Sequence, residues 1–207
     1  MCRRLGPLPV ASALSIAMPA PNLGDLGACA SGRGGYITKG LALRCAPLVI
    51  ERLYKQTDLP SVIEVYTASI RSLAAPFYSP EQIVAWAPAT PNAERWQERL
   101  ASLHTIVADC DGVLSGFVSY RHDGYLDLLF THPAFARRGI ATRLYSRVES
   151  ALRSEGCRRV FTHASLAARP FFDCHGFHVD AEESVECRGA YLRRFAMHKE
   201  LSVERSA

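Results

Sequence analysis

The chain has 207 residues, a formal charge of +4 and an isoelectric point near 8.7, which suits one domain with a buried core plus an appendage. Its positive charge is almost all arginine and is too mild to indicate a nucleic-acid-binding protein, and no apolar run is long enough to span a membrane. The seven cysteines are scattered without a CxxC pair, so neither a disulfide framework nor a structural zinc site is expected. These features predict a protein of a reducing compartment with no metal, nucleic-acid or membrane partner.

The first 46 residues differ in composition from the rest of the chain. They are rich in Gly, Ala, Pro and Ser, and Asp25 is their only acidic residue. We predict a largely unstructured extension at 1–46 and a folded domain at 47–203. Arginines without acids are weakly typical of an organellar transit peptide, and Pro9 to Ala17 is weakly similar to a secretory apolar region. A later translation start is a third possibility. We place the protein in the cytoplasm, with an organelle as the alternative.

One strand and three helices are predicted for the first half of the domain. Pro60 in a first turn supports a helix that opens at Asp58, and Ser79 with Gln82 forms a capping box for a second helix. Trp86 and Trp96 are expected to pack in the core. The predicted elements are a strand at 48–54 and helices from Asp58 onwards, from Ser79 to Trp86 and at 93–100.

Three antiparallel strands follow, joined by turns at Asp111-Gly112 and Asp123-Gly124, because these dipeptides favour tight hairpin turns. After a long helix the chain continues with a strand, a short helix and a last hairpin that turns at Arg188-Gly189. The predicted ranges are strands at 103–108, 113–120 and 125–130, a strand at 160–164, a helix at 167–174, and hairpin strands at 178–186 and 191–201.

The stretch from Leu126 to Leu152 is the most informative part of the chain. It begins as a short, almost continuously apolar strand that Pro133 ends, and from Ile140 its apolar residues recur at the spacing of one helical face. A helix is therefore predicted to start at or near Gly139. The first amides of a helix lack partners and carry partial positive charge, so they form an anion site, here most suited to phosphate.

The loop before this helix strengthens the phosphate prediction. Arg137 and Arg138 add positive charge, while Gly139 and Ala141 are small enough for a pyrophosphate to lie against the backbone. Any basic loop before a helix has these properties, so the motif alone leaves the ligand open.

Taken together, these segments resemble the GNAT superfamily of acyl-CoA-dependent N-acetyltransferases over 48–201. The segments that carry the resemblance are Thr131-His132-Pro133, the Arg137–Thr142 loop, the amphipathic helix, the strand at 160–164 and Ala168 to Phe177. The resemblance implies an α/β (α+β) fold with a mixed, mostly antiparallel central sheet of six to seven strands flanked by helices. It also implies acetyl-CoA as cosubstrate. The family's R/QxxGxG/A loop maps to 136–141, where Gly139 and Ala141 match and Ala136 departs.

The resemblance implies two sets of cofactor contacts. Backbone amides of the strand at Leu129, Phe130 and Thr131 stabilise the oxyanion, and the loop amides bind the pyrophosphate. His163 and Ser165, at the end of the next strand, face the pantetheine region, where Ser165 is the preferred contact. The remaining predicted contacts are Arg137, Arg138, Gly139, Ile140, Ala141, Thr142 and Phe172.

Asp127 is the candidate catalytic base, because it interrupts an apolar strand where relatives often carry an acidic base. Partial desolvation is expected to raise its pKa. The alternative is an aspartate that satisfies backbone donors or pairs with an arginine, and Glu81, His132 and a water relay stay open as bases.

The family's usual leaving-group acid, a tyrosine, is replaced by Phe172. A thiol with a pKa of about 8.5 leaves as thiolate and takes a proton from water. Cys174 and His175 are further candidates for this role.

The preferred function is transfer of an acetyl group from acetyl-CoA to a primary amine of a small molecule or peptide, by direct attack on the thioester. The alternatives are a non-catalytic acyl-CoA sensor or interaction module, suggested by Ala136 and Phe172, and a phosphate-binding protein unrelated to acyl transfer. We expect a monomer or homodimer. The acceptor depends on how the first helices and the final hairpin shape the acceptor groove.

Overall fold

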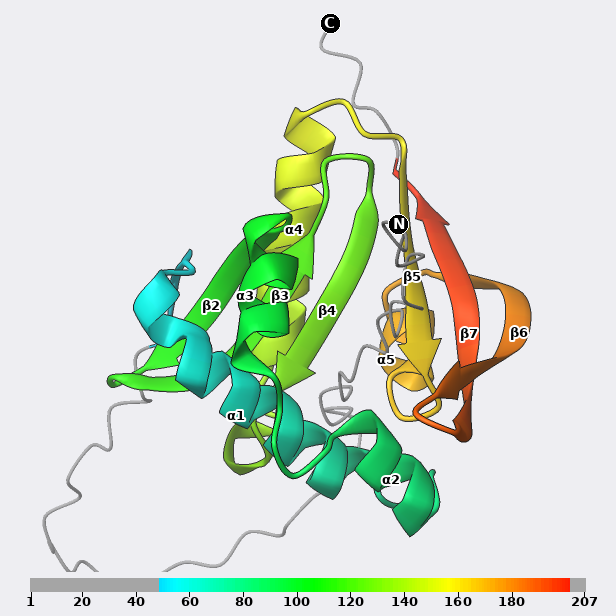
Figure 1. Cartoon of the computed structure of the whole chain (residues 1–207). Coiled ribbons are helices and arrows are strands. Elements are labelled where there is room, and N and C mark those ends of the chain that lie inside the picture. Colours follow the sequence, from blue (N-terminus) through cyan, green and yellow to red (C-terminus); the bar gives the residue numbers. More distant parts are fainter. Residues whose placement is uncertain (1–48, 202–207) are drawn as a thin grey trace, which may run out of the picture.

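The computed structural model describes residues 49–201, in which seven strands form one sheet (Figure 1). The strand order is β1-β2-β3-β4-β5-β7-β6, and every neighbouring pair is antiparallel except β4 and β5. The predicted mixed, mostly antiparallel sheet is therefore confirmed, while the predicted extension at 1–46 lies outside the described residues. The strands are β1 (Val49–Leu53), β2 (His104–Cys110), β3 (Val113–Tyr120), β4 (Tyr125–Thr131), β5 (Arg159–Ser165), β6 (His178–Cys187) and β7 (Ala190–Glu200).

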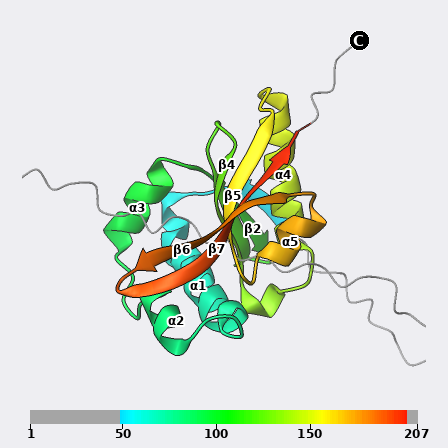
Figure 2. The same ribbon diagram turned by 90° about the vertical axis from the view of Figure 1, so that its right-hand side faces the viewer.

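Helices cover both faces of the sheet. Figure 1 and Figure 2 show α1, α2 and α3 on one face and α4 and α5 on the other. The helices are α1 (Leu59–Ser69), α2 (Pro80–Trp86), α3 (Ala93–Ala101), α4 (Ile140–Ser154) and α5 (Arg169–Cys174), with a π-helical turn (Ile70–Ala74) and two 3-10 turns (Gln56–Asp58 and Pro133–Phe135).

Local capping explains where two of these helices begin. Ser79 Oγ accepts a hydrogen bond from the Gln82 amide at 3.3 Å, and Gln82 Oε1 accepts one from the Ser79 amide at 2.8 Å. This is the predicted capping box at the start of α2. Asn92, which the sequence analysis did not single out, caps α3 by accepting a hydrogen bond from the Arg95 amide at 2.9 Å.

The sheet divides the core into two clusters. Leu144, Val148 and Leu152 pack from α4 against one face, at the spacing that the sequence predicted for this helix. Trp86 is buried in the other cluster, and Trp96 packs at its margin, with its ring centroid 4.7 Å from that of Tyr66. Both tryptophans therefore have the predicted packing role.

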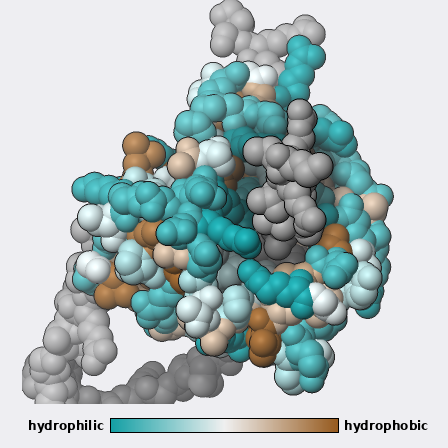
Figure 3. All heavy atoms as spheres, in the orientation of Figure 1, coloured by the Kyte–Doolittle hydropathy of each residue, from teal (hydrophilic) through white to brown (hydrophobic). Residues whose placement is uncertain are grey.

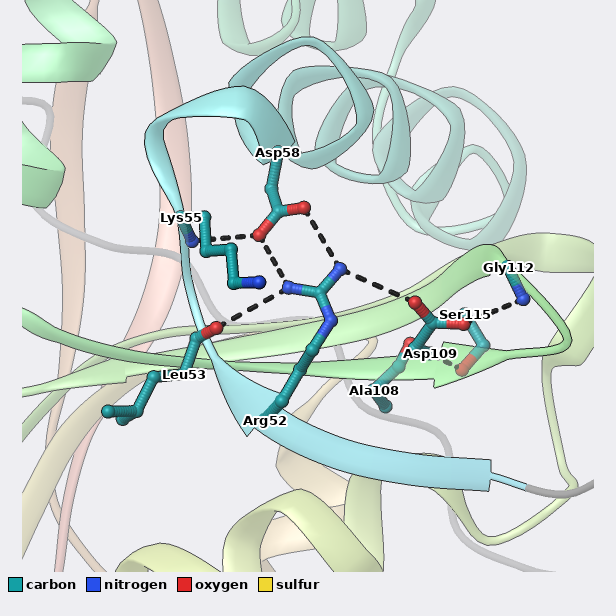
Figure 4. Close-up of polar contacts among 8 residues, drawn as sticks. All are labelled: Arg52, Leu53, Lys55, Asp58, Ala108, Asp109, Gly112 and Ser115. Carbon is teal, nitrogen blue, oxygen red and sulfur yellow. Dashed lines mark hydrogen bonds and ion pairs between the residues drawn. The ribbon is translucent and has the colours of Figure 1, made fainter.

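A partly buried arginine network joins β1 to the start of α1 (Figure 4). Arg52 donates to both carboxylate oxygens of Asp58, at 2.7 and 3.0 Å, and to Asp109 Oδ2 at 3.3 Å. The Lys55 amide donates to Asp58 as well. The hydrogen bond from Arg52 is the largest influence on Asp58 and holds the pKa of its carboxyl below the usual value. These contacts fix the first strand in the sheet.

The face that carries α1 and α3 is largely hydrophilic, with apolar side chains in small separate patches (Figure 3). In the part of the chain that the structure describes, the large apolar side chains that are exposed come from several different elements. They are Ile50, Leu53, Phe77, Val84, Val113, Val179 and Tyr191.

Candidate active site

Strands β4 and β5 lie side by side at one end and separate towards the other. They pair only at Tyr125 with Phe161 and at Leu126 with Thr162. Beyond Leu126 the two strands diverge, and Figure 1 shows their carboxyl ends well apart. The separation that the family resemblance implies is therefore present, and it opens beside the predicted site residues of β4.

The amides of β4 alternate in direction after this point. The His132 amide donates to Ser115 O on β3 at 2.9 Å. Because amides two residues apart point to the same side of a strand, the Phe130 amide also faces β3, whereas those of Leu129 and Thr131 are directed to the β5 side. Of the three predicted oxyanion donors, two thus face the region between the diverging strands.

The loop after β4 takes up an unusual backbone conformation. His132 Nδ1 accepts a hydrogen bond from the Ala134 amide at 3.2 Å, which starts a short 3-10 turn. Arg137 and Gly139 then adopt positive φ angles of 62° and 78°. Two left-handed residues so close together turn the chain sharply into α4, and Gly139 takes this conformation without steric strain.

The first turn of α4 has the properties of an anion site. Gly139 is the N-cap and provides no side-chain cap, and within residues 49–201 the amides of Ile140, Ala141 and Thr142 donate no hydrogen bond. A Cβ atom built on Gly139 meets nothing within 4 Å, so the space beside the backbone is open. Bare amides, open space and the helix dipole suit a pyrophosphate group.

The side chains of this loop and first helical turn divide into a buried and an exposed set. Ile140 and Ala141 are buried and attach the helix to the core, while Arg137 and Arg138 are exposed. The Arg138 guanidinium lies over the ring of Phe135, 5.5 Å from its centroid. Two exposed positive charges therefore lie close to the bare amides of the first helical turn.

Asp127 lies at an irregularity of β4. Ser119 pairs with Leu128 and Tyr120 with Leu126, so Asp127 has no partner on β3. This β-bulge directs its side chain to the face that carries α3, where Asp127 Oδ2 accepts a hydrogen bond from Arg99 Nε at 2.8 Å. Asp127 is only 7% exposed. The arginine-paired aspartate that the sequence left open as an alternative is thus the arrangement observed.

Arg99 is partly buried, and its pairing with Asp127 raises the pKa of its guanidinium. Burial lowers the pKa of its guanidinium, but the Asp127 carboxylate outweighs burial and the pKa stays above the usual value. Arg99 Nη2 is buried and has no hydrogen-bond partner in the described part of the chain. The sequence does not reveal this role of Arg99, because nothing in the local pattern of α3 links it to a strand 28 residues further on.

A second cluster of polar side chains lies at the point where β4 and β5 separate. Tyr125 Oη lies 3.1 Å from His163 Nδ1, and His163 Nε2 lies 3.7 Å from Glu183 Oε2. Arg194 Nε in turn donates to the same Glu183 oxygen at 2.7 Å. These four residues come from β4, β5, β6 and β7, and only His163 was singled out in the sequence.

Ser165 and Phe172 are more deeply placed than a cofactor contact requires. Ser165 is fully buried, and its Oγ accepts a hydrogen bond from the Ala168 amide at 3.1 Å. Phe172 is fully buried with its ring centroid 4.9 Å from that of Phe177. Both residues therefore support the start and the core side of α5, and their contact with a cofactor stays a prediction.

The other candidates for proton transfer lie apart from Asp127. Glu81 is exposed at the start of α2, where it accepts a hydrogen bond from Ser79 Oγ at 2.7 Å. Cys174 is exposed, and His175 Nδ1 lies 2.8 Å from Phe171 O in its own helix. His132 caps the turn after β4. None of these groups shares a hydrogen bond with Asp127 in the described residues.

No cluster of three or more metal-ligating side chains occurs within residues 49–201. None of the helices in that same range is long and apolar enough to cross a membrane.

Comparison with known families decides the assignment. The family model described as the acetyltransferase (GNAT) domain matches residues 74–201. The chain belongs to the GNAT acetyltransferase family. This membership confirms the predicted family and makes the protein an N-acetyltransferase by class.

Individual relatives support the same assignment. The uncharacterized N-acetyltransferase YafP of Escherichia coli (strain K12) is 35% identical over 146 residues, which cover 70% of this chain and 92% of YafP. A GCN5-related N-acetyltransferase from Rhodopseudomonas palustris has a TM-score of 0.71 and 30% identity, over 78% of this chain and 100% of that one. The PaiA N-acetyltransferase from Thermoplasma acidophilum, solved in complex with coenzyme A, has a TM-score of 0.58 and 22% identity, over 74% and 99% of the two chains.

Proposed function

We propose that the protein transfers an acetyl group from acetyl-CoA to a primary amine of a small molecule or peptide, by direct attack of the amine on the thioester. The observation that carries this proposal is the first turn of α4, whose amides have no partner among residues 49–201. This turn follows the strand that diverges from β5. An N-acetyltransferase needs both features, because the amides bind the pyrophosphate and the diverging strands admit the pantetheine arm.

The residues of the chain divide this work. The amides of Gly139 to Thr142, with Arg137 and Arg138, bind the pyrophosphate. The amides of Leu129 and Thr131 face the developing oxyanion, where fixed donors favour the transition state over the ground state. Ser165 and Phe172 support the β5–α5 side of the same opening. Acetyl-CoA supplies the activated acyl group.

The acceptor amine is proposed to approach from the face that carries α1 to α3. Asp127 lies there, paired with Arg99, and its carboxylate attracts the ammonium form of an amine. The Asp127 side chain lies on this face because the bulge in β4 directs it away from α4. The cytoplasmic location and the monomeric or homodimeric state stay predictions.

A non-catalytic acyl-CoA sensor is the second candidate. One observation favours it: residue 172 is a buried phenylalanine, which has no hydroxyl to protonate a departing thiolate. A thiol with a pKa of about 8.5 can leave as a thiolate without such an acid, so the phenylalanine is compatible with turnover.

Binding and turnover experiments on the full chain test the proposal. We expect acetyl-CoA to bind more tightly than ATP or pyrophosphate in calorimetry, and to release CoA thiol in the presence of at least one member of a broad amine panel. Tight binding with no thiol release across the panel supports the sensor. Binding of acetyl-CoA no tighter than that of ATP supports a site for phosphate alone.

Asp127→Asn is expected to lower the rate of acetyl transfer by about 100-fold, because the negative charge that attracts the ammonium form of the acceptor is lost. The affinity for acetyl-CoA should be nearly unchanged, because Asp127 lies away from the α4 loop. Steady-state kinetics and calorimetry measure the two quantities separately. The pH–rate profile of the variant should keep the limbs of the parent profile, and loss of the lower-pH limb would show that Asp127 is itself the base.

A further inference from the structure

Tyr125 and His163 flank the point where the two strands separate. The last pair between the strands joins Leu126 to Thr162, so His163 is the first residue of β5 beyond it. Val160 and Ala164 belong to the core beneath α4, and His163 therefore projects from the opposite face, towards the acceptor side. Tyr125 reaches the same place from β4, since its hydroxyl contacts the imidazole.

The partners of His163 determine where its proton sits. Glu183 Oε2 lies 3.7 Å from Nε2, which is too far for a hydrogen bond, but its negative charge favours a proton on that side of the ring. The favourable arrangement places the proton on Nε2, directed towards Glu183. Nδ1 then carries the lone pair and accepts a hydrogen bond from the Tyr125 hydroxyl at 3.1 Å.

The charges around this pair keep both groups in the states that the arrangement needs. Burial and the Arg194 guanidinium lower the pKa of His163 and outweigh the opposing effects of Glu183 and Asp127, which favours the neutral imidazole. Burial, followed by the Asp127 carboxylate, raises the pKa of Tyr125 to about 12, so its hydroxyl stays protonated and able to donate.

Asp127 is less suited to take up a proton. Its Oδ2 already accepts the hydrogen bond from Arg99 Nε, and Arg99 Nη2 is buried with no partner in the described part of the chain. Protonation of Asp127 would leave the guanidinium charge of Arg99 without its counter-ion in a partly buried place, which is unfavourable. Asp127 therefore serves better as a fixed negative charge that attracts an ammonium group.

We propose that Tyr125 and His163 form a proton relay that deprotonates the acceptor amine. This inference rests on the proposed function. One N–H bond of the ammonium breaks and its proton passes to Tyr125 Oη, while the proton of that hydroxyl moves to His163 Nδ1. The products are a neutral amine and an imidazolium whose Nε2–H faces Glu183. The imidazolium returns its proton to solvent after turnover.

The tautomer of His163 is tested by NMR without any acceptor. In the ¹⁵N-labelled full chain, with His163→Gln used to assign the signal, we expect a neutral imidazole with its proton on Nε2 at pH 7. Tyr125→Phe should shift the Nδ1 resonance to that of an unbonded lone pair. An imidazolium at pH 7, a proton on Nδ1, or a resonance that Tyr125→Phe does not move overturns the relay.

Kinetics test the same relay during turnover. His163→Gln and Tyr125→Phe should each lower kcat/KM by about 100-fold and remove the lower-pH limb of its pH profile, with the Kd for acetyl-CoA unchanged. Asp127→Asn should lower the rate but keep that limb. His122→Gln is the matched control: this exposed histidine also pairs with a glutamate, 2.6 Å from Glu155 at the far end of α4, and its loss should change nothing.

The two proposals fail in different ways. A parent chain that does not bind acetyl-CoA overturns the proposed function and the relay together. A parent chain that acetylates an amine, with His163→Gln retaining the full rate and the pH limb, overturns the relay alone.

Discussion

Gly139→Glu is expected to abolish acetyl-CoA binding while the chain stays folded. Gly139 is the N-cap of α4, and the space beside its Cα is open, so a glutamate side chain extends into the place proposed for the pyrophosphate. Its carboxylate competes for the bare amides of the first helical turn and repels the anionic ligand. We expect affinity to fall on the order of 100-fold or more, equivalent to about 2.7 kcal/mol.

Folding should be affected much less. The φ angle of +78° at Gly139 disfavours any side chain by about 1–2 kcal/mol, and a negative charge at a helix N-terminus offsets part of that cost. Gly112→Glu is the matched control, because Gly112 has a φ of +83° and equally open surroundings, but lies in the β2–β3 turn. Calorimetry with acetyl-CoA should show binding by the control and none by Gly139→Glu. Unchanged affinity in Gly139→Glu would refute the placement of the pyrophosphate.

The parts of this fold that the sequence predicted are the parts that neighbouring residues determine. Asp111-Gly112 forms the turn between β2 and β3, Ser79 and Gln82 form their capping box, and α4 begins one residue after Gly139. Each depends on contacts within a few residues, where backbone preference and spacing suffice. The anion site at α4 belongs to this group, because a helix N-terminus generates it without any distant partner.

The chemistry on the acceptor side could not be predicted in the same way. The bulge at Asp127 depends on how β3 and β4 align, and alternation along an apolar strand does not reveal it. Arg99 reaches Asp127 from a helix, and Glu183 reaches His163 from the edge strand β6. Such pairs are brought together by the sheet order, so their members look like ordinary surface charges in the sequence.

The burial of two predicted cofactor-contact residues could not be predicted from the sequence either. The resemblance placed Ser165 and Phe172 at the cofactor, but the positions of their side chains depend on the turn between β5 and α5. Ser165 Oγ accepts the Ala168 amide, and Phe172 packs with Phe177. A family pattern identifies the positions near a ligand but does not show which of their side chains are buried in the core.

Gly124→Ala is expected to cause the largest loss of stability. Gly124 lies in the turn before β4, where its carbonyl accepts a hydrogen bond from the Phe161 amide at 3.0 Å. A Cβ atom there would collide with the carbonyl oxygen of Arg159 and lie 2.9 Å from Cys157 Sγ. The carbonyl belongs to the backbone at the start of β5, so the clash is relieved only if the two strands move apart.

The position of this clash is what makes it damaging. Tyr125 with Phe161 and Leu126 with Thr162 are the only pairs that join β4 to β5, and both lie within two residues of Gly124. We expect Gly124→Ala to lower the free energy of unfolding by about 3–5 kcal/mol, as overpacking adds to the strain of a φ angle of +91°.

Gly156→Ala separates the two causes. Gly156 has a φ of +77°, but a Cβ atom built on it meets nothing within 4 Å, so alanine there carries the backbone strain of about 1 kcal/mol without the clash. Urea unfolding of both variants should therefore give a midpoint that is clearly lower for Gly124→Ala. Equal midpoints would show that β5 can move at its paired end without loss of stability. The packing of α4 and α5, and not this junction, would then determine how the two strands are placed.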